Sequence, residues 1–139
     1  GNASFELDGA SFSIDVANSD DYGEDEENDF SLVTSLRFGQ VGFLFAGDAE
    51  NARLAELLKE GSLSHHVLKV PHHGKGETLS AAFFQAVGPS YAVITSDEKN
   101  PEDEVVPALL RQLGAEVFLT REGTVTVLTD GESIRVTQL

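Results

Sequence analysis

Three apolar segments of the sequence each end in polar side chains that can bind metals or transfer protons. Aspartate and histidine at neighbouring strand ends are typical of metal sites, because both offer lone pairs to a divalent cation. The segments and the residues that follow them are 41–46 with Asp48, 67–70 with His72 and His73, and 91–95 with Ser96 and Asp97. The pattern indicates a candidate metal site at Asp48 and the histidine pair.

Each of these positions also has a structural interpretation. Asp48 directly precedes a helical segment and could cap it, while Ser96 and Asp97 could cap the following loop. The histidine pair could be a surface turn, which is also the interpretation of His65-His66. Nucleophilic catalysis has less support, since the sequence contains no G-x-S-x-G motif and no ordered triad.

The elements that position these residues follow from the apolar periodicity. Residues 41–46 are almost continuously apolar, which predicts a strand buried on both faces, and residues 48–61 have helical spacing. Residues 100–103 predict a helix start, with Pro107 indicating a late start or a kink. The other predicted elements are a hairpin at 4–7 and 11–16, strands at 31–38, 67–70 and 91–95, a helix at 81–87, and a closing three-stranded meander at Glu116–Leu119, 124–128 and 133–137. This order predicts a mixed α/β fold with helices on one face of the sheet.

The composition limits the function classes. At 139 residues the chain has the length of one domain, and the absence of cysteine excludes disulfides and thiolate chemistry. With 24 acidic and 9 basic residues the formal net charge is −15, and no basic stripe is visible. A strong nucleic-acid surface is therefore not expected. No apolar run approaches the roughly 18–20 residues that span a bilayer.

Much of the negative charge lies in residues 15–29, which contain no basic side chain. Low hydrophobicity and a block of like charge predict a flexible, solvent-exposed loop. Calcium binding is the alternative, although the spacing does not match an EF-hand loop. That alternative predicts calcium-induced ordering of the same residues.

Three stretches together resemble a known family: NDFSLVTSLRFGQVGFLFAGDAE, then LKVPHHG, then SYAVITS. Their order and spacing are similar to the later half of a metallo-β-lactamase-fold domain. Within that superfamily they most resemble the extracytoplasmic domain of the competence protein ComEC and its stand-alone relatives. The resemblance covers most of the chain from Asn28 onward. It implies the C-terminal half of an αββα sandwich, with residues 1–139 as a single partial domain, and an extracytoplasmic or cell-envelope location.

The resemblance also implies roles for individual residues. Asp48 matches the aspartate that bridges two metal ions. Either His72 or His73 matches the late histidine ligand, and His73 is favoured because related domains place the ligand just before glycine. His65 and His66 match no ligand of the family. The residues expected to face the substrate are Asn28, Asp29, Ser31, Lys75 and Ser96.

Two departures from the family pattern shape the functional expectation. The main metal motif, H-x-H-x-D-H, is absent, and Asp48 with the histidines supplies too few ligands for two zinc or manganese ions. We therefore expect the back half of a longer protein, with this stretch alone inactive and without bound metal. The second departure is DEKNPEDE, which stands where many relatives have His-Pro and leaves the substrate specificity open.

The function implied for the complete protein is metal-dependent hydrolysis of an ester or phosphodiester, with a small phosphoester, an ester or DNA as substrate. The alternative is a non-catalytic binding module with a degenerate, metal-free fold. The first expected partner is the missing N-terminal half. An apolar sheet face exposed by half a fold would also favour a homodimer.

Overall fold

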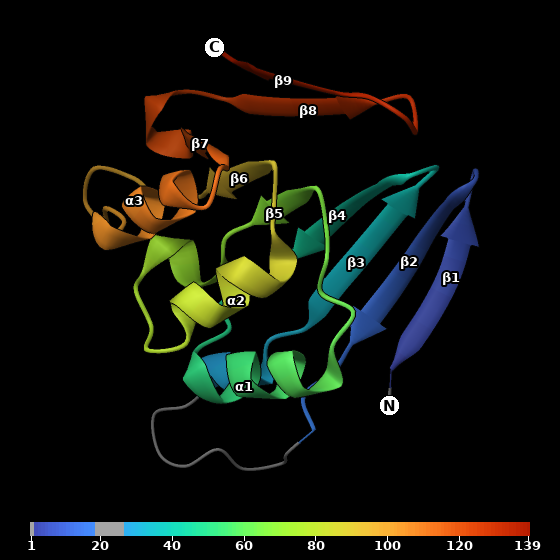
Figure 1. Ribbon diagram of the computed structural model, residues 1–139, viewed down its shortest axis with the longest axis horizontal. Helices are drawn as coiled ribbons and strands as arrows, with labels where there is room; N and C mark the ends of the chain where they lie inside the picture. Colours follow the sequence, from blue (N-terminus) through green and yellow to red (C-terminus); the bar gives the residue numbers. More distant parts are fainter. Residues whose placement is uncertain (1, 19–26) are drawn as a thin grey trace.

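The computed structural model describes residues 2–18 and 27–139, and a seven-stranded sheet with the order β1-β2-β3-β4-β5-β6-β7 forms its centre (Figure 1). The strands β1 to β4 pair antiparallel, whereas β4 to β7 pair parallel. The strands are β1 (Ala3–Leu7), β2 (Ala10–Asp15), β3 (Val33–Phe38), β4 (Val41–Phe45), β5 (Val67–Lys69), β6 (Tyr91–Ile94) and β7 (Glu116–Leu119). The predicted mixed α/β class is confirmed.

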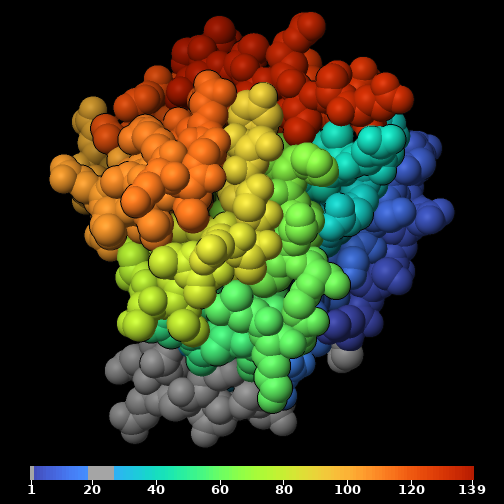
Figure 2. Space-filling model, viewed as in Figure 1, coloured from blue at the N-terminus to red at the C-terminus, as the bar shows by residue number. Residues whose placement is uncertain are grey.

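The helices α1 (Asn51–Glu60), α2 (Ser80–Val87) and α3 (Val105–Gln112) cover one face of this sheet. Leu44 of β4 pairs with Leu68 of β5, and the other strand side chains of the buried core lie on the same face of the sheet as these two leucines. The largest apolar helix side chains buried against them are Leu54, Phe83, Phe84 and Leu110. Figure 2 shows the green to orange segments, which carry the three helices, closing over this face. No helix in the described part of the chain is both long and apolar enough to cross a membrane.

The opposite face of the sheet, called the outer face here, is also apolar. Its central row of paired residues is Phe5, Phe12, Leu36, Phe43, Val67 and Tyr91. A hairpin of β8 (Val125–Thr129) and β9 (Ile134–Gln138) covers part of it, above a pocket of about 250 Å³ lined by Phe43, Val67 and Val127. Away from the hairpin, Phe5 is 50% exposed and Leu7 61% exposed. Part of an apolar face is therefore uncovered.

The predicted closing meander is wrong. The strand β7 pairs in parallel with β6 at the edge of the main sheet, because α3 crosses over between these two strands. The strands β8 and β9 pair with each other in a separate sheet. The hairpin is fastened to the β3–β4 turn, where the Gln40 N–H donates to the Gly131 carbonyl at 2.6 Å. A Cβ on Gly39 would lie 2.5 Å from the same carbonyl oxygen, so this close approach requires glycine.

Two other predictions concern the start of α3 and the ends of the acidic loop at residues 15–29. The late start predicted for α3 is confirmed, and Pro107 lies in its first turn, where a missing N–H removes no intrahelical bond. The ends of the predicted loop at 15–29 are wrong, since Asp15 belongs to β2 and Glu27–Phe30 form a short 3-10 helix, η1. Residues 19–26, on which the calcium alternative mainly depends, lie outside the described residues.

Candidate metal centre at the end of β5

Both histidines of the PHHG stretch lie in a left-handed turn, η2 (Pro71–Gly74), directly after β5. The φ and ψ angles are 52° and 40° at His72 and 53° and 28° at His73. A side chain in this conformation costs about 1–2 kcal/mol per residue. Gly74 follows with a φ of 81°, and a Cβ there would lie 2.7 Å from the Cβ of Glu102. Two adjacent strained residues of a metal-binding type are more typical of a functional site than of an ordinary turn.

Asp48 and His73 face each other across the ends of β4 and β5, with 3.1 Å between Asp48 Oδ1 and His73 Nε2. The Nδ1 atom of His73 lies 2.8 Å from the Thr95 carbonyl oxygen, which can only accept a hydrogen bond. Nδ1 therefore carries a hydrogen, and a neutral ring presents its Nε2 lone pair to the carboxylate. Two such acceptors repel each other unless a proton or a cation lies between them. A backbone carbonyl that orients the ring in this way is typical of metal-bound histidine.

His72 points to a different pair of carboxylates. Its Nδ1 lies 3.4 Å from Glu50 Oε1 and 3.3 Å from Glu77 Oε1. The three ligand atoms lie within 4.8 Å of one another, and all three side chains are partly buried. The pKa of Glu77 is raised, first by burial and then by the negative charges of Glu50 and Asp29, against the hydrogen bond from His72. Negative charge is therefore crowded at this point.

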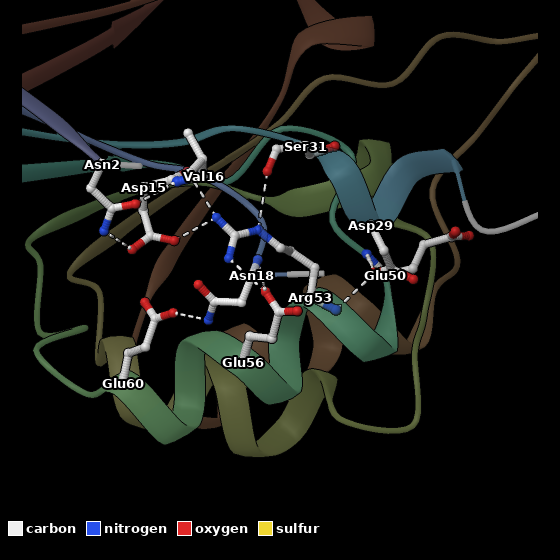
Figure 3. A network of polar contacts seen from close by, with 10 residues as sticks. All are labelled: Asn2, Asp15, Val16, Asn18, Asp29, Ser31, Glu50, Arg53, Glu56 and Glu60. Carbon is white, nitrogen blue, oxygen red and sulfur yellow. Dashed lines mark hydrogen bonds and ion pairs between the residues drawn. The ribbon is translucent and has the colours of Figure 1, made fainter. Parts of the chain in front are cut away.

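Asp29, predicted to face the substrate, lies in the interior at 0% exposure. Its Oδ1 accepts hydrogen bonds from the N–H groups of Glu50 at 3.1 Å and Arg53 at 2.8 Å, so it caps α1. This is the role that the structural interpretation gave to Asp48. Figure 3 shows Asp29 beside Glu50, while the guanidinium of buried Arg53 points away to Asp15, at 2.6 Å.

Ser31 and Asn28, the other predicted residues from this segment, contact the candidate ligands directly. Ser31 Oγ accepts a hydrogen bond from the Asp48 N–H at 3.2 Å, and it thereby positions the start of that loop. Asn28 Nδ2 lies 3.4 Å from His72 Nε2. Both side chains therefore support the ligands. This is consistent with the expectation that Asn28 and Ser31 face the site without binding metal.

A pocket of about 370 Å³ opens beside the turn. Lys75, predicted to face the substrate, lines it, and its Nζ donates to the Pro101 carbonyl at 2.8 Å. Asp97 caps the following loop, as its structural interpretation predicted, because its Oδ1 accepts from the Lys99 and Asn100 N–H groups at 2.8 and 2.7 Å. The residues around the pocket are His72, His73, Lys75, Thr95, Asp97 and Asn100.

Ser96, the last predicted residue, is 8% exposed and does not line this pocket. The pKa of the nearby Glu102 is lowered to about 2, chiefly by hydrogen bonds from Arg121. The Arg121 Nη2 atom is 2.9 Å from Glu102 Oε1. Because Glu102 packs under Gly74, this ion pair links the left-handed turn to the end of β7.

Sequence reasoning missed three charged residues near the turn. Lys69 Nζ donates to the Gly47 carbonyl at 3.1 Å, and burial lowers its pKa while the charge of Asp48 opposes this shift. Its signal was a lone lysine within an apolar strand. Glu50 stands two residues after Asp48 and could have been included on that ground. Glu77 had no sequence signal, because its approach to His72 depends on the path of the chain before α2.

The surface-turn interpretation of His65-His66 is wrong for His65, which is 4% exposed. Its Nδ1 lies 2.8 Å from the Leu63 carbonyl oxygen, and its Nε2 lies 2.6 Å from Ser35 Oγ. Burial is the main cause that lowers the pKa of this imidazole, with a smaller contribution from Arg37. His66 is exposed, and its Nδ1 accepts from the Gly42 N–H at 3.1 Å.

The sequence matches no family model, and no curated protein matches it either. The resemblance to metallo-β-lactamase-fold domains accordingly stays a prediction from the sequence.

Proposed function

We propose that the chain is the later half of a metal-dependent hydrolase of the metallo-β-lactamase type, which acts on an ester or phosphodiester. The observation that carries this proposal is the Asp48–His73 pair at the carboxyl ends of two parallel strands, 3.1 Å apart, in a strained turn. Ligands gather at such strand ends in open α/β sheets. The substrate is a small phosphoester or ester in preference to DNA, because a net charge of −15 disfavours a polyanion.

The residues present fit part of a metal centre. Two ligand atoms about 2.1 Å from a zinc ion at the tetrahedral angle lie about 3.4 Å apart. The contact between Asp48 and His73 is close to that spacing, and one nitrogen with one carboxylate oxygen suits zinc, with manganese as the second candidate. A bound metal of this kind lowers the pKa of a coordinated water and offsets charge that develops on the substrate.

The protein groups around the pair keep it in place. The Thr95 carbonyl fixes the His73 ring and its tautomer, and Ser31 holds the backbone at Asp48. Lys75 lies on the wall of the neighbouring pocket, where an ammonium group favours an anionic substrate. The chain therefore contributes ligands, their orientation and part of a substrate surface, and we expect the missing half to contribute the remaining ligands.

The outer face of the sheet supports a missing half. Phe5, Leu7 and Phe45 are between 43% and 61% exposed there, and the hairpin β8–β9 covers only one part of the face. Contiguous apolar surface of this kind is usually covered by a partner. We infer that the N-terminal half of the same protein packs on it, and that the chain alone is inactive.

The alternative function is a metal-free binding module. The internal role of Asp29 favours it, because a predicted site residue is used to cap a helix. The net negative charge is consistent with a surface that recognises a basic partner. This alternative predicts that the intact protein holds no metal after loading.

The deciding experiment is metal content by elemental analysis, together with hydrolysis of bis(p-nitrophenyl) phosphate and of duplex DNA, on the complete protein. We expect the hydrolase centre to account for about two metal ions per chain. Asp48→Ala and His73→Ala should lower the hydrolysis rate by at least ~100-fold, since even outer contacts of metal sites are worth about 10–100-fold.

The matched control is His66→Ala, which removes an exposed histidine from the other end of β5 and should leave metal content and rate unchanged. A complete protein that stays metal-free after loading with zinc or manganese would rule out the hydrolase and favour the binding module.

A further inference from the structure

We propose that Glu50, His72 and Glu77 form a divalent-cation site that this chain completes by itself. The site is separate from the Asp48–His73 pair and needs neither of those residues nor a missing half. It goes beyond the proposed hydrolase function and also differs from the expectation, based on the sequence, that this stretch alone binds no metal.

The geometry of the three side chains fits a common ion. His72 Nδ1 lies 3.4 Å from Glu50 Oε1 and 3.3 Å from Glu77 Oε1, and all three atoms lie within 4.8 Å of one another. Ligands about 2.1 Å from zinc at the tetrahedral angle are separated by about 3.4 Å, so an ion between them would require little movement. The ligands come from the loop before α1, the turn after β5 and the loop before α2. The fold brings these three segments together at the carboxyl ends of β4 and β5.

A buried carboxylate beside this cluster is an independent indication of a cation. Among residues 2–18 and 27–139, no group hydrogen-bonds to Asp29 Oδ2, although Asp29 is 0% exposed. Its other oxygen accepts a hydrogen bond from the N–H of Glu50, and its charge raises the pKa of Glu77, so Asp29 adds negative charge close to the cluster. An unpaired buried carboxylate oxygen destabilises the fold unless a positive charge compensates it.

The described side chains do not supply that positive charge. Within the part of the chain that the structure describes, the ion pairs of Glu50 and Glu77 are both with His72. The guanidinium of Arg53 points away from Asp29 to Asp15 and Glu56 (Figure 3). The amino end of α1 offsets only about half a charge. Three carboxylates and one imidazole thus keep an excess of negative charge that a divalent cation would balance.

The imidazole can change from hydrogen-bond donor to ligand by one local rearrangement. With Asn28 Nδ2 donating to His72 Nε2, the ring carries its hydrogen on Nδ1 and donates to Glu77. When a cation takes the Nδ1 lone pair, that proton moves to Nε2 and the Asn28 amide turns to accept from it. Proton and cation therefore compete for one atom, and Asn28 can satisfy both states.

The ligand set defines the kind of ion. One imidazole nitrogen with two carboxylates suits zinc, and manganese binds the same set more weakly. Calcium prefers six to eight oxygen ligands, so a site with an imidazole does not favour it.

The test is titration of the chain as it stands with Zn²⁺, followed by calorimetry and by ¹⁵N NMR of the histidine rings. We expect one site per chain, with Zn²⁺ shifting His72 Nδ1. Glu77→Gln and His72→Gln should weaken binding by at least ~10-fold, while Glu132→Gln, a control on the exposed loop of the β8–β9 hairpin, should keep it within about twofold.

Two outcomes would overturn the site. The first is weakening by Glu132→Gln equal to that by Glu77→Gln, which would indicate attraction to the net charge alone. The second is a Zn²⁺-induced shift at His73 in place of His72, which would place the ion on the hydrolase pair and leave the proposed function intact. If a variant fails to fold, the NMR titration of the unsubstituted chain still decides between His72 and His73.

Discussion

The two histidine pairs of this chain flank the same short strand, yet they have opposite environments. His65-His66 precede β5, and His65 is 4% exposed with a hydrogen-bond partner at each ring nitrogen. His72-His73 follow β5 in a left-handed turn, and their rings point at carboxylates. In the first pair, His65 uses its polarity to stabilise the interior, whereas the second pair keeps partly exposed side chains beside carboxylates.

The difference shows that position on the sheet decides what a histidine pair does. At the amino end of β5, Ser35 of β3, which lies beyond β4 in the sheet, is a partner for His65. At the carboxyl end the loops after β4 and β5 meet, and loops at that edge of a parallel sheet are free to carry functional groups. Stability and function are therefore separable by substitutions on either side of β5.

The largest effect is expected from His65→Ala. It would leave a cavity and would remove the partners of Ser35 Oγ and the Leu63 carbonyl, at a cost of about 3 kcal/mol in the free energy of unfolding. His73→Ala should cost less than about 1 kcal/mol, because the His73 side chain is 53% exposed and its backbone keeps the same conformation. Denaturant unfolding monitored by circular dichroism measures both values.

Zinc titration of the same two variants supplies the control. Under conditions in which the His65→Ala variant is folded, it should bind zinc as tightly as the original chain does, since no proposed ligand contacts His65. Equal destabilisation by the two substitutions would contradict the division of roles.

The next effect concerns Gly74, which allows the turn that carries the candidate ligands. Gly74→Ala would place a Cβ 2.7 Å from Glu102 Cβ and from Ile94 Cγ2 at a φ of 81°, and we expect a loss of about 2 kcal/mol. Gly88→Ala is the matched control, because Gly88 is also left-handed but its nearest neighbouring atom is 3.8 Å away. The control should lose only about 1 kcal/mol in thermal or denaturant unfolding.

Equal losses at Gly74 and Gly88 would show that backbone conformation alone matters. In that case the close packing of the turn on Glu102 would not be the reason for a glycine after the histidine pair.

The sequence predicted the ends of β4 and β5 to within one residue, because apolar runs mark buried strands. The prediction that β4 is buried on both faces is wrong at Phe45, which is 43% exposed. The meeting of Asp48 with His73 was predicted from the family resemblance, and the parallel pairing of β4 with β5 brings their carboxyl ends together. These predictions needed only local composition, chain order and the recognised motifs. Local patterns are the part of a fold that a single sequence records most directly.

Other features depended on contacts between distant segments. The burial of His65 requires Ser35, which is 30 positions away in the sequence. The approach of Glu77 to His72 requires the path of the loop before α2. Asp29 was assigned to the substrate side from the family resemblance, and no local signal relates it to the start of α1, which begins more than twenty residues later. Tertiary contacts of this kind are not encoded in any window of the sequence.

The smallest expected effect is the contribution of His65 to the pH dependence of stability. Burial lowers the pKa of His65 in the folded chain below the value of about 6.5 expected when the chain is unfolded. Above pH 6.5 both states hold a neutral ring, so His65 contributes no slope there. As the pH falls below 6.5, the unfolded chain binds a proton that the folded chain does not, and the free energy of unfolding decreases until the folded-state pKa is reached.

Unfolding titrations between pH 7.5 and about pH 5, above the range where most carboxyl groups titrate, should therefore show a slope that His65→Gln reduces. Glutamine keeps a polar group near Ser35 but cannot bind the proton, so this variant separates titration from the loss of packing. An unchanged slope would mean that the buried imidazole is not the group that responds. The contrast between the two histidine pairs would then depend on packing and geometry, and protonation would play no part in it.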